Sequence, residues 1–128
     1  MEELAGYTAK QREPLCTAYR GKEICGMPPP SSGGIAVAAT LGMLERLPMN
    51  EHKPTDMDLN GGKPSVMGVH LISEAERLAY ADRDFYYGDT SLPPEEPVAG
   101  LLSKDYAKAR AKLVNTERND AAVSPGDP

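Results

Sequence analysis

The stretch MPPPSSGGI at residues 27–35 decides the fold of this chain, because one element must end in it and another can begin. Its consecutive prolines cannot donate the hydrogen bonds of a β-ladder, so a strand has to stop there. Ser32 is a favourable N-cap, since a serine hydroxyl can accept a hydrogen bond from an unpaired backbone N–H. Two glycines allow the helix start to pack closely against its neighbours. We interpret the motif as a structural cap, made of Pro28, Pro29, Pro30, Ser31, Ser32, Gly33 and Gly34.

Upstream of this motif, REPLCTAYRGKEICGMP at residues 12–28 is typical of a β-hairpin. With Arg20 and Gly21 as the two loop residues, Gly21 supplies the positive φ that such a turn requires. This register places Cys16 opposite Cys25, which suits disulfide geometry. The spacing is not C-x-x-C, so a redox or zinc motif is disfavoured. Two reduced, partly buried thiols, as in a cytosolic chain, are the alternative.

Downstream of the motif, the sequence predicts three helices. Residues 33–47 are apolar on all sides until Glu45, which predicts a helix buried all round, and Pro48 ends it. Residues 48–64 form a polar loop in this interpretation. The other helices are expected at 66–87 and at 104–114, separated by a Pro-rich connection at 89–100, and Ser103 caps the last one. The pattern predicts an α+β fold, locally a β-hairpin followed by three helices.

The tail at residues 115–128 has almost no apolar content, so we expect it to be disordered when alone and residues 1–114 to form the folded part.

The helix at 66–87 carries two charged residues on faces that otherwise point to the core. Apolar residues recur at helical spacing in two neighbouring lines: Leu71, Ala75, Leu78 and Phe85, with Ile72, Ala79 and Tyr86 alongside. Asp82 follows the first line and Arg83 the second. An unpaired buried charge costs several kcal/mol, so Asp82 must be partnered by Arg83, another basic group or backbone N–H donors. We favour a structural ion pair over a catalytic role.

Composition and charge exclude several classes of function. The formal net charge of −5 argues against a nucleic-acid partner, which needs clustered Lys and Arg. The one local concentration of basic residues is interpreted as a solvated helix face: Lys104, Lys108, Arg110 and Lys112. No run reaches the roughly 18–20 apolar residues that span a bilayer. The first thirteen residues lack the basic and apolar regions of a signal peptide, so we expect none in this chain.

Neither metal nor cofactor chemistry is indicated. His52 and His70 are the only histidines, and a zinc site needs three or four ligands at characteristic spacing. The Ser-Ser-Gly-Gly start of the first helix lacks the Lys-Ser/Thr pair of a phosphate-binding loop, and no dinucleotide fingerprint is present. Neither Ser31 nor Ser32 has a histidine base nearby in sequence, so a serine nucleophile is unsupported. We predict no metal and no cofactor.

Three stretches together resemble the γ-glutamyltransferase family of N-terminal-nucleophile hydrolases: residues 27–35, AYADRDFYYGD at 79–89 and PVAGLLSKDYAKA at 97–109. The resemblance runs from about Leu4 to the end and implies the last part of the large subunit, with residues 1–114 a partial large-subunit segment. It implies a fragment of a four-layer αββα fold. Family members are made as precursors that cut themselves and release an N-terminal threonine, which the resemblance places downstream of Pro128.

The resemblance also implies an activity and partners. The family cleaves γ-glutamyl amides such as glutathione through a threonine acyl-enzyme and passes the glutamyl group to water or an amino acid. The partners would be the remainder of the large and small subunits and a small γ-glutamyl substrate. The family's export to the periplasm or cell surface favours a Cys16–Cys25 disulfide. No catalytic or substrate-binding residue of the family maps onto this chain, so we expect the isolated chain to be inactive.

Two alternatives to this function stay open. Related acylases that act on glutaryl-cephalosporins or poly-γ-glutamate share the architecture, and this segment does not exclude them. The chain could also serve as a non-catalytic structural or interaction module derived from the enzyme.

Overall fold

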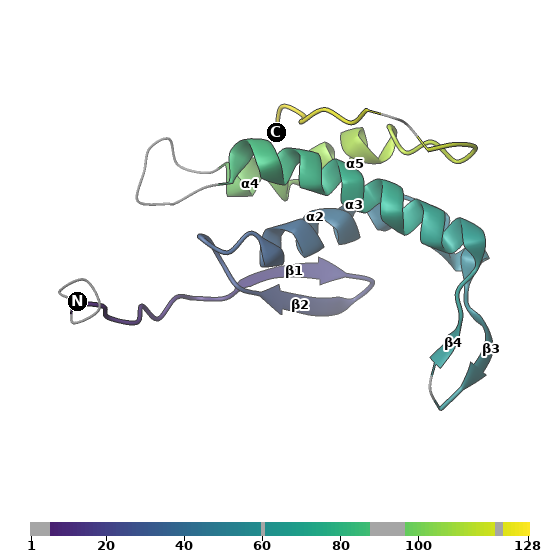
Figure 1. Cartoon of the computed structure of the whole chain (residues 1–128), viewed down its shortest axis with the longest axis horizontal. Coiled ribbons are helices and arrows are strands. Elements are labelled where there is room, and N and C mark those ends of the chain that lie inside the picture. The colour runs from purple at the N-terminus through teal and green to yellow at the C-terminus, as the bar shows by residue number, and fades with distance from the viewer. Residues whose placement is uncertain (1–5, 60, 88–96, 120–121) are drawn as a thin grey trace.

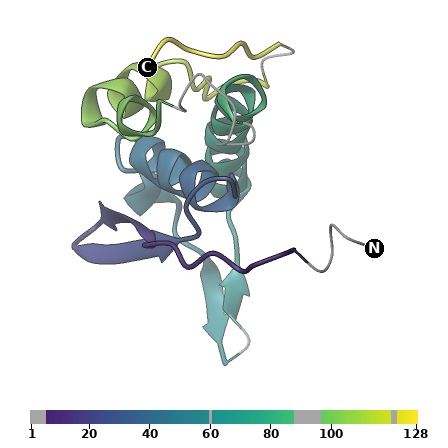
Figure 2. The same cartoon turned by 90° about the vertical axis from the view of Figure 1, so that its left-hand side faces the viewer.

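The computed structural model describes residues 6–59, 61–87, 97–119 and 122–128. Its elements, in chain order, are β1 (Leu15–Tyr19), β2 (Lys22–Gly26), α2 (Gly33–Leu44), the 3-10 helix η1 (Met49–His52), β3 (Thr55–Asp58), β4 (Gly61–Lys63), α3 (Val66–Tyr86), α4 (Val98–Leu101) and α5 (Lys104–Ala111). The hairpin β1–β2 lies under α2, and α3 and the α4–α5 pair lie on the other side of α2 (Figures 1 and 2). No helix in the described part of the chain is long and apolar enough to cross a membrane.

The first hairpin has the register that the sequence predicts. Strands β1 and β2 are antiparallel, with Cys16 opposite Cys25 and Tyr19 opposite Lys22. Both loop residues have positive φ, 50° at Arg20 and 74° at Gly21. Positive φ at both positions is the mark of a type I′ turn, whose twist matches that of the flanking strands. The alternate residues of β1 that include Thr17 and Tyr19 are partly buried, so one face of the hairpin packs on α2.

The helix α2 begins where the sequence predicts, but Ser32 does not cap it. Ser32 has helical backbone angles (φ −82°, ψ −12°) and makes no side-chain cap hydrogen bond. An N-cap normally needs an extended backbone to turn its hydroxyl back to the helix. Close packing at the helix start rests on Gly34. A Cβ atom there would clash with the carbonyl of Met27, whereas one at Gly33 would meet only the Ser31 Oγ at 3.7 Å.

The core forms where α2, α3 and α5 meet. Its buried cluster is Met43, Leu44, Ala75, Leu78, Ala79 and Ala111. Three expectations about burial are wrong. Ile72, expected on a core-facing line of α3, is 39% exposed. Phe85 is 68% exposed, although it continues the helical spacing of the core-facing line on α3. The first helix is not buried all round, since Val37 on α2 is 53% exposed.

Two segments expected to be loops contain regular structure. The predicted loop at 48–64 holds η1 and the antiparallel pair β3–β4, which projects away from the helices (Figure 1). All residues of β3 are exposed, and only Gly61 of β4 is partly buried, so the sequence shows no apolar alternation that would predict these strands. In the connection expected at 89–100, residues 89–96 lie outside the described residues, and the last part belongs to the short helix α4.

The two later helices match their predicted starts and end slightly early. Helix α3 follows Ser65, whose hydroxyl accepts a hydrogen bond from the Gly68 N–H at 3.0 Å. Ser103 caps α5 as predicted, since its hydroxyl accepts from the Tyr106 N–H at 3.1 Å. In both cases the cap residue is extended, which is the geometry that Ser32 lacks.

After α5 the chain turns back along the helices. Asn115 starts this return, and its carboxamide oxygen accepts hydrogen bonds from the N–H groups of Glu117 and Arg118. Residues 122–128, here called the strap, then pass over the gap between α3 and the α4–α5 pair (Figure 2). The strap is extended and makes specific contacts described below, which the expectation of a disordered tail did not foresee. Low apolar content did not reveal them because most of these contacts are made by strap backbone atoms.

Candidate functional site

A buried ion pair joins α3 to α5. Asp82 is 3% exposed and Arg110 is 5% exposed. The Arg110 Nη2 donates to Asp82 Oδ1 at 2.8 Å and to the Leu78 carbonyl at 3.0 Å. Asp82 is thus buried and partnered by a basic group, as its place in the core-facing line of α3 requires. The partner is Arg110 from another helix, although Arg110 was expected on a solvated face.

The same two side chains hold the strap. The Gly126 N–H donates to Asp82 Oδ1 at 2.8 Å, and Arg110 Nη2 donates to the Ser124 carbonyl at 3.0 Å. A third contact comes from Tyr86, whose hydroxyl donates to the Gly126 carbonyl at 2.6 Å. We call Asp82, Tyr86, Tyr106 and Arg110 the clamp. Three bonds to backbone atoms therefore fix this part of the strap.

Tyr106 closes the clamp from α5. A Cβ atom on residue 126 would collide with the Tyr106 hydroxyl, so only glycine fits under the ring at this position. Burial raises the pKa of the Tyr106 hydroxyl well above its ordinary value, and the neighbouring Asp82 carboxylate raises it further. Arg110 acts in the opposite direction, but burial dominates. Tyr106 is therefore a neutral side chain at physiological pH.

Arg83 has a different role from Asp82. Its Nε donates to the Ser32 Oγ at 2.8 Å, and its Nη1 lies 2.8 Å from Asp84 Oδ1. The guanidinium is partly exposed and also lies over the Tyr80 ring, 5.4 Å from the centroid. Ser32 thus ties the start of α2 to the end of α3 instead of capping its own helix.

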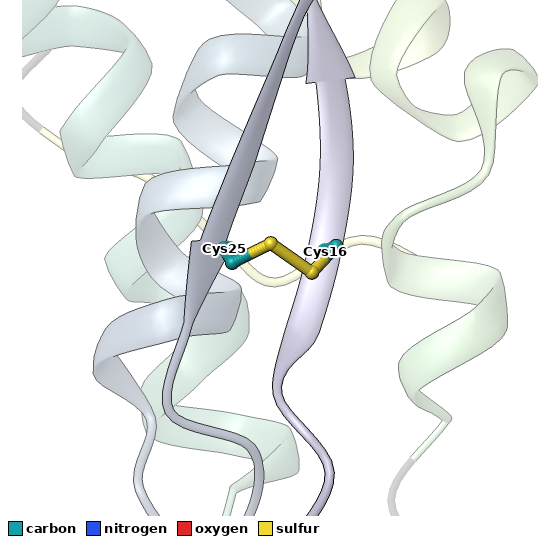
Figure 3. The surroundings of a disulfide bond; sticks show 2 residues. All are labelled: Cys16 and Cys25. Carbon is teal, nitrogen blue, oxygen red and sulfur yellow. A yellow bond between two sulfur atoms is a disulfide. The ribbon is translucent and has the colours of Figure 1, made fainter.

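The hairpin carries the disulfide on its outer face. Cys16 and Cys25 lie directly opposite each other, 4.1 Å apart at Cα, and their sulfur atoms are bonded (Figure 3). Glu23 lies close enough to complete the group of three potential metal ligands found among the described residues. The two cysteines already share a bond, so neither offers the thiolate that a metal would require.

Among the residues that the structure describes, Ser32 and the two histidines do not combine into a nucleophile and base. His70 lies near the start of α3, where its Nε2 is 2.6 Å from the Asn115 carbonyl. Ser32 contacts Arg83. Arg83 follows His70 by thirteen residues on α3, which is roughly 20 Å at 1.5 Å per residue. The His52 carbonyl accepts a hydrogen bond from Ser65. The Asp82 and Arg110 charges are buried and paired with each other, which gives the clamp the chemistry of a structural anchor.

The opposite side of α3 is open. A groove of about 390 Å³ runs between α2 and α3, and its walls are mainly apolar. Val37, Leu41, Ile72 and Tyr80 line it, and we call these four residues the bare face. Val37, Ile72 and Tyr80 are all exposed. Exposed apolar side chains gathered in this way mark a surface that packs against something else.

Sequence reasoning missed Arg110, Tyr106 and Gly126. A signal for the first two was present in α5, where the buried positions are Tyr106, Ala107, Arg110 and Ala111. That is the spacing of a core-facing line, and it contains an arginine just as the line on α3 contains Asp82. Two opposite charges in two core-facing lines could have been paired from the sequence. The need for glycine at position 126 could not be predicted from the sequence, because it depends on how closely the strap approaches Tyr106.

Comparisons with known proteins agree along nearly the whole chain. The family model described as gamma-glutamyltranspeptidase matches residues 1–127. A glutathione hydrolase proenzyme of Escherichia coli strain K12 is 36% identical over 127 residues, covering 98% of this chain and 20% of that protein. The proenzyme named acylase ACY 1 from Pseudomonas sp. strain SE83 is 37% identical over 116 residues, covering 91% of this chain and 19% of that protein.

A solved structure shows the same arrangement. The crystal structure of Helicobacter pylori gamma-glutamyltranspeptidase superposes with a TM-score of 0.78 at 32% identity, covering 98% of this chain and 34% of that chain. The chain therefore spans about a fifth of the length of these curated relatives and about a third of the solved chain.

Proposed function

Because the chain belongs to the gamma-glutamyltranspeptidase family, we propose that it is the last part of the large subunit of a precursor that cleaves γ-glutamyl amides such as glutathione. The glutamyl group passes through a threonine acyl-enzyme to water or to an amino acid. The observation that carries this proposal is the match to the family model over residues 1–127, together with the curated glutathione hydrolase proenzyme.

In this proposal the nucleophile lies in the polypeptide that follows Pro128. The chain supplies architecture: the motif at 27–35 joins the hairpin to α2, and the clamp joins α3, α5 and the strap. The whole enzyme has the four-layer αββα arrangement, of which the present helices form part of an outer layer. The periplasm or the cell exterior is its proposed location, and an exposed disulfide is consistent with an oxidising compartment.

The partner of this chain is the remainder of the large and small subunits. The support comes from the bare face, where Val37, Ile72 and Tyr80 expose apolar surface next to the groove. A chain that spans a third of its solved relative leaves the covering segments outside itself. We place the bare face against those segments, because apolar surface of this kind is stabilised by burial at about 25 cal/mol per Å².

The test compares the isolated chain with the longer protein. Release of a chromogenic amine from a γ-glutamyl anilide is measured for both, each purified from a host that lacks its own enzyme. We expect activity from the longer protein, and a Thr-Thr-His sequence in frame soon after Pro128. Turnover by the isolated chain, or a stop codon at that place, would contradict the proposal and favour the non-catalytic module.

A second candidate is an acylase of the same family. The acylase ACY 1 proenzyme matches at an identity similar to that of the glutathione hydrolase, so this segment alone does not separate the two activities. Assaying the longer protein on glutaryl and γ-glutamyl amides in parallel distinguishes them. The preferred substrate is the one with the larger kcat/KM.

A further inference from the structure

The strap is held by its backbone at one fixed register. Ser124 contributes its carbonyl, and Gly126 contributes both its N–H and its carbonyl. None of these groups depends on the identity of a strap side chain. The register is set separately by Tyr106, which leaves no room for a Cβ atom at position 126. A shift of the strap by one residue would bring Pro125 or Asp127, each of which carries a Cβ atom, under the ring.

Stability alone does not explain a clamp of this kind. Removing two opposite charges from water costs free energy that their attraction often fails to recover, so a buried ion pair is weak support for stability. The clearest effect of Asp82 and Arg110 is geometric, since each binds both the other helix and the strap. The strap is thereby locked against the core up to Gly126, two residues before Pro128, and the path of the following chain is set from that point.

We propose that the clamp is a positioning device for precursor cleavage, and that Asp82, Tyr86 and Arg110 are positioning residues for that reaction. The inference rests on the proposed function, in which the cut lies downstream of Pro128. The cleavage hydrolyses one peptide bond: water adds a hydroxyl group to the new carboxyl end and a hydrogen to the new α-amine of the threonine. A displaced scissile bond reacts slowly, because a misplacement of about 1 Å can cost roughly a hundredfold in rate.

The experiment follows cleavage of the full-length precursor after cell-free synthesis, by the appearance of the two product chains on a gel and by their masses. Gly126→Ala pushes the strap away from Tyr106 and is expected to slow cleavage at least roughly tenfold. Tyr86→Phe removes one hydrogen bond to the Gly126 carbonyl and keeps the ring. It therefore tests the positioning role of the clamp even if Gly126→Ala does not fold. We expect a slowing of roughly two- to fivefold for it.

Matched controls separate positioning from loss of folding. Gly33→Ala adds a methyl group where the nearest neighbour leaves room, and Tyr80→Phe removes a hydroxyl from an exposed tyrosine on the bare face. Both controls should cleave within about twofold of the wild type. Once cleaved and isolated, the Tyr86→Phe enzyme should retain the wild-type kcat/KM, whereas a merely structural defect would lower both the cleavage rate and kcat/KM.

The outcomes also separate this inference from the proposed function. If the wild-type precursor does not cleave itself, the proposed function fails and this inference fails with it. If the wild type cleaves and both clamp variants cleave at the rate of their controls, the clamp has no positioning role although the family function stands. Slower cleavage of the clamp variants with normal kcat/KM after cleavage establishes the inference.

Discussion

The two sides of α3 reverse the usual distribution of residues. On the side of α5, a charged pair is almost fully enclosed: Asp82 and Arg110 lie under the strap. On the side of α2, Val37, Ile72 and Tyr80 of the bare face are exposed to solvent. Soluble domains normally bury apolar groups and expose charges. The clamp side is completed within this chain, whereas we propose that the bare face is completed by polypeptide outside it.

The clamp side should depend strongly on one carboxylate. Replacing Asp82 by alanine leaves the buried Arg110 guanidinium and the Gly126 N–H without their acceptor, and we expect a loss of about 3 kcal/mol or more. The measurement is urea unfolding of the 128-residue chain. The matched control is Asp84→Ala, two residues along the same helix. Its exposed pair with Arg83 should contribute under about 1 kcal/mol.

Equal effects at Asp82 and Asp84 would contradict the assignment of the two sides. They would mean that the α3 face carrying Asp82 is solvated and that the strap does not seal it.

The hairpin under α2 should depend on its disulfide instead. Cys16 and Cys25 close a loop of ten residues, which the loop-entropy model values at about 2.5–3 kcal/mol. We expect the double variant Cys16→Ser, Cys25→Ser to lose most of that free energy of unfolding. Hydrogen exchange should show faster opening of β1 and β2, while the Gly126 N–H in the clamp keeps its protection.

Thiol titration of unreduced, denatured chain gives the independent control for the disulfide. It should find no free thiol after oxidative folding. Two free thiols would restore the alternative of a reduced pair, and loss of protection at Gly126 in the double variant would show that the hairpin and the clamp are not separate units.

Local patterns were enough to predict the elements that depend on neighbours in sequence. The Arg20-Gly21 turn predicted the register of β1 and β2, because φ must be positive there. Helical spacing on α3 predicted the burial of Leu71 and Asp82. The same reasoning required a partner for Asp82 but could not choose among the basic groups available.

The errors arose where distant segments meet. Ser32 looked like a cap, yet its hydroxyl is taken by Arg83, which lies 51 residues away. Phe85 continued the apolar spacing of α3 but is 68% exposed. The strap was expected to be disordered because its composition is polar, and its anchors are backbone atoms that composition does not report. The contacts of Ser32 and of the strap are tertiary contacts that no local pattern contains.

On the clamp side, Tyr106 should make the free energy of unfolding depend on pH, with a smaller effect than the loss of Asp82 or of the disulfide. The folded chain holds Tyr106 neutral, since burial raises the pKa of its hydroxyl above the ordinary value near 10. Above about pH 10 the unfolded state loses this proton while the folded state keeps it, so stability falls as the pH rises. The slope from one group is at most about 1.4 kcal/mol per pH unit. Tyr106→Phe should be less sensitive over pH 9.5–11.5 by urea unfolding, and identical slopes for the two proteins would mean that Tyr106 is solvated.

The smallest effect is expected on the bare face, and it is the most informative about what lies outside the chain. Val37 is half exposed, so Val37→Asp should change the stability of the isolated chain by within about 0.5 kcal/mol. In the longer protein the same carboxylate would be buried without a partner, at a cost of several kcal/mol. We therefore expect soluble expression and thermal stability of the longer protein to fall sharply, while Lys112→Asp at the exposed end of α5 leaves both unchanged. A longer protein that tolerates Val37→Asp as well as Lys112→Asp would show that the bare face stays open in the enzyme, and the contrast between the two sides of α3 would then need another explanation.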